Sequence, residues 1–296
     1  MIRTPPSYVL GINARNIDYI SVYNKKKDFP LVDNKLTTKR ILQKAGLPCP
    51  KLYHSYQWFW ELQQLPEHLS KLCNFVMKPA RGLAGGGILV LQEQAPDNWQ
   101  TPSGKSYSTK RLVAHGSDIL YGVHSIDNTT DTVLIEQKLN QHQFFNNLNP
   151  DGISDIRVIV LDHTPMMAMC RIPTEESDGK ANISLGAIGA GINMDTGEII
   201  HAVTKKGSID YHPDSKECLI GRHIPFWQEI MAMSRRIQDY FPLGYLGVDI
   251  VLDKDQGPLI LELNARPGLE IQNANREGLK RRIERHFTEA SLWVDL

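Results

Sequence analysis

The chain has 296 residues, enough to bury a sizeable core in one compact unit or in two to three lobes. It carries 33 basic and 33 acidic residues, so its net charge is zero, and no global basic field indicates a nucleic acid or an anionic membrane as partner. No apolar run approaches the roughly 18 residues that span a bilayer, and the first residues lack the apolar core of a signal peptide. We therefore expect a cytoplasmic protein with reduced cysteines, and we leave open whether it forms a homo-oligomer.

In the first half of the chain, the pattern predicts helices followed by strands. Residues 1 to about 30 indicate an irregular lead-in. A helix is expected over 35–45, because Gly46 just past it and the prolines that follow are stop signals. Further helices are expected at 58–65 and 67–72, and strands at 75–78, 87–91 and 132–136. The polar residues 94–108 contain prolines and a glycine, so they predict a mobile excursion.

Lys78 ends one of these strands and leads into a glycine-rich loop, Pro79–Gly87. Glycines let backbone N–H groups approach phosphate oxygens, and a lysine at the root of such a loop adds a positive charge. The Gly-Lys-Ser/Thr ending of a Walker loop is absent. From these residues alone, a phosphate-binding loop and an ordinary glycine-rich hairpin both stay open.

The second half of the chain predicts two strand pairs. Strands at 155–161 and 165–171 indicate an antiparallel pair, and a glycine-rich, close-packed segment follows at 185–192. A helix expected at 224–241 precedes the second pair, and a basic helix at 278–287 follows it.

The second pair is a hairpin of 247–252 and 258–264, with turn residues between them. With the turn centred on its middle residue, Asp249 lies opposite Glu262, and Glu262 and Asn264 project from one face. Facing carboxylates destabilise a sheet, so neutralising either is expected to leave the fold intact or slightly more stable. Two carboxylates and an amide oxygen suit Mg²⁺, which completes its shell with water and nucleotide phosphates. A solvated sheet face with chance acidic residues is the alternative.

The three oxygen ligands stand in a Gly-Val-Asp … Leu-Glu-Leu-Asn-Ala-Arg-Pro-Gly setting that resembles the metal-binding end of an ATP-grasp domain. The resemblance covers most of the chain and is closest to ribosomal-protein glutamate-adding ligases and alpha-L-glutamate ligase-related proteins. The other stretches that carry it are 10–16, 30–39, 77–82, 135–137, 155–157, 169–174 and 180–182. It implies an α+β fold in which two α+β lobes clasp ATP after a short N-terminal lead-in. The domains would be an N-terminal segment with helices (1–75), an ATP-grasp N-lobe (76–139) and a C-lobe with the Mg-binding hairpin (140–296).

The resemblance also implies roles for individual residues. Lys78 would contact the α- and β-phosphates, Arg171 would lie beside the γ-phosphate and an acyl phosphate, and Arg266 would hold the acceptor or a phosphate. A structural ion pair is the alternative for Arg266. The hinge Glu136–Leu139 would read adenine through its backbone, and Asp155 would bind the ribose unless it is a simple strand cap. The full set of expected nucleotide-binding residues is Lys35, Lys39, Lys78, Arg81, Gly85, Gly86, Glu136, Gln137, Lys138, Leu139, Asp155, Lys180 and Asn182.

Asp249, Glu262 and Asn264 would bind Mg²⁺, or Mn²⁺ in its place. Together these residues imply an ATP-dependent carboxylate–amine ligase that works through an acyl phosphate and adds glutamate or a similar amino acid to an amino acid, a peptide or a protein tail. Ile183, Ser184 and Leu185 replace the family's usual His-containing continuation, which leaves the choice of acceptor open. A phosphotransferase and a catalytically silent nucleotide-binding module are the alternatives.

Overall fold

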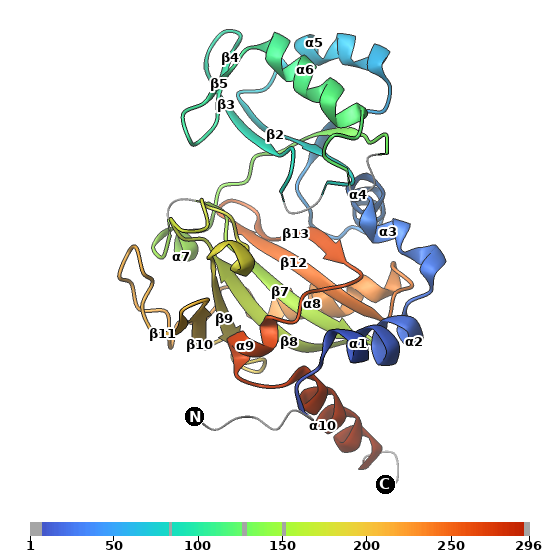
Figure 1. The fold of residues 1–296 in the computed structure, drawn as a ribbon, viewed down its shortest axis with the longest axis vertical. Helices are drawn as coiled ribbons and strands as arrows, with labels where there is room; N and C mark the ends of the chain where they lie inside the picture. Colours follow the sequence, from blue (N-terminus) through green and yellow to red (C-terminus); the bar gives the residue numbers. More distant parts are fainter. Residues whose placement is uncertain (1–7, 83–84, 126–128, 150–151, 293–296) are drawn as a thin grey trace. The chain divides into compact units, whose positions relative to one another are not determined.

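The computed structural model describes residues 8–82, 85–125, 129–149 and 152–292. The chain divides into two compact units, Met1–Val32 with Asn140–Leu296 (unit 1) and Asp33–Leu139 (unit 2). Figure 1 labels most of their α-helices and strands. None of the described helices is long and apolar enough to cross a membrane. Each unit is built on one antiparallel sheet with helices around it.

Unit 2 is built on a six-stranded antiparallel sheet with the strand order β1-β6-β2-β3-β4-β5. Its strands are β1 (Leu52–Tyr56), β2 (Asn74–Pro79), β3 (Leu89–Ala95), β4 (Asn98–Gln100), β5 (Ser106–Tyr107) and β6 (Val133–Glu136). Its helices are α4 (Lys35–Lys44), the 3₁₀ helix η4 (Phe59–Gln64), α5 (Leu65–Leu69) and α6 (Thr109–Leu120).

Alternation along two neighbouring strands decides which side chains of unit 2 are available for chemistry. Met77 of β2 and Ile135 of β6 belong to the main core of the unit, together with apolar residues of α5 and α6. Lys78, Leu134 and Glu136 therefore project from the opposite face, because successive side chains of a strand point to opposite sides. Leu134 joins a small apolar cluster with α4 on that face. The sheet thus presents a lysine and a glutamate beside the start of a helix.

Helix α4 begins and ends close to the predicted positions. The side-chain oxygen of Asn34 accepts hydrogen bonds from the N–H groups of Leu36 (3.0 Å) and Thr37 (3.1 Å), which caps the first turn. Gly46 follows the helix with a φ of +64°, a conformation that glycine adopts at no steric cost.

Unit 1 is built on a seven-stranded antiparallel sheet with the strand order β11-β10-β9-β8-β7-β12-β13. Its strands are β7 (Asp155–Leu161), β8 (Thr164–Ile172), β9 (Ile188–Ile192), β10 (Ile199–Thr204), β11 (Gly207–Ile209), β12 (Tyr245–Asp253) and β13 (Gly257–Asn264). Its helices are α7 (Gln143–Asn146), the 3₁₀ helix η5 (Ile183–Leu185), α8 (Trp227–Arg236), η6 (Ile237–Asp239), α9 (Ile271–Asn275) and α10 (Leu279–Leu292). The chain begins with α1 (Ile12–Ala14), the π-helical turn η2 (Arg15–Ile20), α2 (Ser21–Tyr23), η3 (Lys26–Asp28) and α3 (Pro30–Asp33), which ends at the boundary with unit 2.

Two of the strand pairings in the unit 1 sheet are the ones that the sequence predicts. Strands β7 and β8 pair antiparallel, and Asp249 of β12 lies opposite Glu262 of β13. The glycine-rich segment is close-packed as expected, since a Cβ on Gly191 would lie 2.3 Å from the carbonyl oxygen of Ala274 in α9. Only glycine at this position lets α9 approach the sheet so closely.

Two expectations about local structure are wrong, and one helix was not expected. Residues 12–23 form short helices rather than an irregular lead-in, and Asn24 ties them to β12 by bonding both the N–H (2.9 Å) and the C=O (2.8 Å) of Tyr245. The predicted excursion 94–108 contains β4 and β5, because Trp99 packs edge-on against Phe75 at 5.0 Å and is only 2% exposed. Helix α6 was not expected from the sequence.

Candidate active site

In unit 2, the structure brings together two lysines and one glutamate that were predicted separately. The Lys78 ammonium lies 2.7 Å from Glu136 Oε2, and the Lys39 ammonium lies 3.2 Å from Glu136 Oε1. Lys39 also donates a hydrogen bond to the carbonyl of Pro50 at 2.5 Å. All three side chains are buried, with exposed fractions of 8% or less. Two cations thus share one carboxylate, which leaves this face of the sheet with a local excess of positive charge.

Burial and charge act against each other in this cluster. Burial raises the pKa of the Glu136 carboxyl, but the two ammonium groups outweigh it and lower the pKa below its ordinary value. Burial lowers the pKa of Lys39, and the charge of Glu136 offsets only part of this effect. Glu136 Oε1 lies 3.2 Å from the Lys39 ammonium and has no well-aligned hydrogen-bond donor among the described residues. A buried carboxylate oxygen in this state can accept a hydrogen bond from a ligand.

The glycine-rich loop is attached to the same part of unit 2. Lys35, at the first position of α4, donates a hydrogen bond to the carbonyl of Gly82 at 3.0 Å. Gly85 and Gly86 are exposed, while residues 83–84 lie outside the described ones. The Arg81 side chain is also exposed, and its backbone N–H donates to the Asp131 carboxylate at 2.9 Å. The structure therefore places Lys35 and the loop together, as a phosphate site would require.

The predicted hinge follows β6 at the end of unit 2. Gln137 accepts a hydrogen bond from the N–H of Lys51 at 3.2 Å, and Lys138 donates to the side chain of Gln92 at 3.2 Å. Leu139, the last residue of the unit, is half-buried. Of the four predicted hinge residues, only Glu136 directs its side chain into the lysine cluster.

In unit 1, four charged side chains form a buried network across β7, β8 and β12. Arg157 places Nε 2.7 Å from Asp249 Oδ1 and Nη2 2.6 Å from Oδ2, which is a two-bond fork. Arg171 donates through Nε to Asp155 Oδ1 at 2.6 Å and through Nη2 to Asp249 Oδ2 at 2.8 Å. Cross-strand pairing explains the cluster: Asp155 faces Arg171, and Arg157 faces Asp249.

Arg157 was not among the predicted site residues. A signal for it was present, because Asp155 and Arg157 are two apart on one strand and must project from the same face. What the sequence lacked was the order of the strands. Only the placement of β12 next to β7 brings Arg157 opposite Asp249.

The network separates the pKa values of its two aspartates. Burial raises the pKa of Asp249, but the guanidinium groups of Arg157 and Arg171 outweigh it and hold the pKa at about 2. Burial also raises the pKa of Asp155, and the negative charge of Asp249 raises it further. The Arg171 guanidinium offsets only part of this rise, so the pKa of Asp155 is about 6. The more strongly charged carboxylate is therefore the one that lies opposite Glu262.

The hairpin supplies donors of the type that Mg²⁺ prefers, all of them oxygen atoms. Asn264 Nδ2 lies 3.1 Å from Asp249 Oδ2, which leaves the amide oxygen of Asn264 pointing elsewhere. Asp249 Oδ2 already accepts three hydrogen bonds, whereas Oδ1 accepts one from Arg157. The described residues contain no cluster of three His, Cys, Asp or Glu side chains that could hold a metal, so an amide oxygen would have to complete the set. The residues fit Mg²⁺ by donor type, with Asp249 shared between the metal and two guanidinium groups.

The other predicted residues of unit 1 lie in contacts of their own. Lys180 pairs with Asp178 at 3.2 Å on the surface, and Asn182 accepts a hydrogen bond from the N–H of Ser184 as the N-cap of η5. The Arg266 guanidinium stacks over the ring of Phe29 at 4.3 Å. The structure thus gathers Asp155, Arg171, Asp249 and Asn264 into one site, while these contacts of Lys180, Asn182 and Arg266 are with other residues.

Residues 14–287 match the model of the family described as sugar-transfer associated ATP-grasp. No curated protein matches the sequence. Among solved structures, the ATP-grasp ligase PsnB complexed with a minimal precursor is similar at 16% identity and a TM-score of 0.50, over 88% of this chain and 60% of PsnB.

Two further structures are similar in fold. D-alanine–D-alanine ligase from Bacillus anthracis complexed with ATP has 15% identity and a TM-score of 0.46, over 89% of this chain and 66% of that one. An ATP-grasp protein with a RimK domain from Sphaerobacter thermophilus has 13% identity and a TM-score of 0.47, over 87% of this chain and 69% of that one. This chain therefore spans about 60% of the length of PsnB and about two thirds of the other two. On the match over residues 14–287, the chain belongs to the sugar-transfer associated ATP-grasp family.

Proposed function

We propose that this protein is an ATP-dependent carboxylate–amine ligase of the ADP-forming type. The observation that carries the proposal is the buried network of Arg157, Arg171, Asp155 and Asp249, which collects two guanidinium groups and two carboxylates at the predicted metal hairpin. A site of this composition can bind phosphate oxygens and, with Glu262 and Asn264, a divalent cation. The family membership supports ATP as the nucleotide.

The chemistry would need no side-chain nucleophile. A substrate carboxylate attacks the γ-phosphorus of ATP, the bond to the β-phosphate oxygen breaks, and ADP leaves with an acyl phosphate as product. An amine then attacks the acyl carbon, loses its proton, and displaces inorganic phosphate to form the amide. Catalysis would consist of positioning and charge neutralisation, which is the usual pattern of phosphoryl transfer.

The residues of the chain have separate parts in this proposal. Lys78 and Lys39 would face the phosphates, with Glu136 as the buried counter-ion that keeps both ammonium groups in place. Arg171 would exchange part of its contact with Asp155 for the transferred phosphoryl group. Asp249, Glu262 and Asn264 would hold Mg²⁺, which when bound neutralises charge on the terminal phosphates.

The substrates are a carboxylate and an amine of undetermined identity. PsnB is complexed with a minimal precursor in one solved structure and with a precursor peptide in another, and we therefore include peptides and amino acids as possible reactants. Glutamate stays a specific candidate by the resemblance of the motifs. Because the family is described as sugar-transfer associated, uronic acids and amino sugars belong in the same screen.

The experiment is a screen of these compounds for stimulated ADP release, with mass spectrometry of the products. Hydroxylamine should trap the acyl phosphate as a hydroxamate whenever the correct carboxylate is present, and ADP release should then match amide formation one for one when the amine is added. Removing Mg²⁺ with a chelator should abolish both. Formation of AMP and pyrophosphate would refute the mechanism. A stable phosphorylated product without any amine requirement would instead identify a phosphotransferase.

A further inference from the structure

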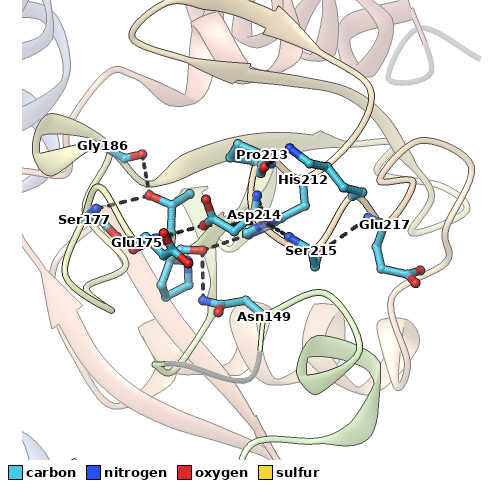
Figure 2. A network of polar contacts seen from close by, with 12 residues as sticks. Asn149, Glu175, Ser177, Gly186, His212, Pro213, Asp214, Ser215 and Glu217 are labelled. Carbon is cyan, nitrogen blue, oxygen red and sulfur yellow. Dashed lines mark hydrogen bonds and ion pairs between the residues drawn. The ribbon is translucent and has the colours of Figure 1, made fainter. Parts of the chain in front are cut away.

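His212 is a buried histidine that the proposed reaction does not use. It is 1% exposed and lies in the loop that follows β11 in unit 1. The loop closes on itself through a hydrogen bond from the His212 N–H to the carbonyl of Glu217 at 2.9 Å. Figure 2 shows the histidine among the polar groups of two other segments, one around Asn149 and one that carries Glu175 and Ser177.

The partners of the imidazole determine which of its nitrogens carries the proton. Nε2 lies 3.0 Å from the carbonyl oxygen of Pro173, which can only accept, so Nε2 must donate. Nδ1 lies 3.2 Å from the N–H of Asp214 and 3.4 Å from the N–H of Ser215, which can only donate, so Nδ1 must accept. In this arrangement His212 is the neutral Nε2–H tautomer and uses both nitrogens.

The contact with Pro173 fixes the start of a loop that returns to the sheet. Pro173 follows β8 directly, and its carbonyl also accepts a hydrogen bond from Asn149 Nδ2 at 2.9 Å. The N–H of Glu175 donates to Asp214 Oδ2 at 2.9 Å, which ties the loop to the His212 turn a second time. Thr174 Oγ1 donates to the carbonyl of Gly186 at 3.1 Å and closes the loop at its far end.

We propose that His212 is a positioning residue that holds the Pro173–Gly186 loop in a form able to cover bound nucleotide. Lys180 and Asn182 lie between the two closing contacts, and the loop starts two residues after Arg171. The inference rests on the proposed function, in which Arg171 contacts the transferred phosphoryl group, so that a loop starting two residues after Arg171 lies next to the bound nucleotide. Loss of the Nδ1 acceptor leaves two N–H groups without a partner, whereas loss of the Nε2 donor leaves Pro173 with Asn149 alone.

Three substitutions separate the two nitrogens. His212→Asn keeps an acceptor near the Nδ1 position, His212→Gln keeps an N–H donor near the Nε2 position, and His212→Ala removes both. We expect His212→Ala to weaken ATP binding about tenfold in calorimetry, the order of one lost buried hydrogen bond. The maximal rate at saturating ATP should change less than about twofold, because the residue acts on loop position and not on the reacting atoms. Asn should restore more of the affinity than Gln.

A second measurement reports on the loop without any nucleotide. Lys180 has a side chain that is 53% exposed, so trypsin cleavage after it, followed by mass spectrometry, measures how often the loop opens. The rate should rise at least several-fold in His212→Ala and not in His223→Ala, an exposed histidine of the same unit. Where the alanine variant does not fold, the Asn and Gln variants give the same comparison. Wild-type ATP affinity and wild-type cleavage in the folded variants would overturn the inference. A wild-type protein that binds no ATP would overturn the proposed function instead, and the cleavage rates would still decide the role of His212 in the loop.

Discussion

Replacing Asp249 by asparagine should lower the stability of the protein. This is the opposite of the effect that the repulsion between the facing carboxylates Asp249 and Glu262 predicts. From the sequence, neutralising Asp249 or Glu262 was expected to relieve repulsion. The structure shows that Asp249 is 1% exposed and pairs with both Arg157 and Arg171. Removal of its charge therefore leaves two buried guanidinium groups with less compensation, which outweighs any relief of repulsion.

The magnitude follows from two independent considerations. The pKa of Asp249 is lowered from 3.8 to about 2, and since one pKa unit equals about 1.4 kcal/mol, its surroundings favour the charged form by about 2–3 kcal/mol. Breaking one partner out of a buried ion pair typically costs about 3–5 kcal/mol. We therefore expect Asp249→Asn to lower the free energy of unfolding by about 2–5 kcal/mol. For a protein of 296 residues, that is a fall in Tm of about 3–8 °C.

The assay is urea unfolding followed by circular dichroism, with calorimetry for Tm. Glu262→Gln is the matched control, because Glu262 is half-buried and lies on the neighbouring strand; it should lose activity and less than about 1 kcal/mol of stability. The double variant Arg157→Met with Asp249→Asn should lose less than the sum of the two single losses, by about 1–3 kcal/mol. An Asp249→Asn protein as stable as wild type, with additive losses in the double variant, would refute the reasoning.

Two further predictions concern activity and pH. Lys78→Met should reduce kcat/KM for ATP, measured by steady-state ADP release, by about 30- to 1,000-fold, because it removes a cation that stabilises the transition state by about 2–4 kcal/mol. The control Lys71→Met, which breaks an exposed pair with Glu67, should leave kcat/KM unchanged. The raised pKa of Asp155 means that its neutral form stabilises the fold below pH 3.8, and this contribution is lost as pH rises through about 6. Urea unfolding at several pH values should show this loss in the wild type and not in Asp155→Asn; equal pH dependence of the two proteins would contradict the assignment.

The sequence predicts local structure correctly where a short stretch of residues, such as a helix cap or an alternating strand, determines that structure. The cap at Asn34 and the stop at Gly46 define α4 without help from the rest of the chain. Strand alternation and turn residues place Asp249 opposite Glu262, which the register confirms. The N-terminal lead-in and β4 were predicted wrongly because their regular structure depends on residues far away in the sequence. Asn24 bonds Tyr245, and Trp99 packs against Phe75.

By itself, the sequence predicted candidate residues for the chemistry: the lysines, the oxygen ligands of the hairpin, and Arg171 with Asp155. It also determined the spacing that places each of them on a strand face or at a helix start. Only the tertiary structure decided which of them meet. The order β8-β7-β12 brings Arg157 onto Asp249 and turns an expected repulsion into a buried ion network. In unit 2, the pairing of β6 with β2 sets Glu136 between Lys78 and Lys39. The residue type determines the charge of a side chain. Its contribution to the stability of the fold depends on neighbouring charges, which are set by the order of the strands.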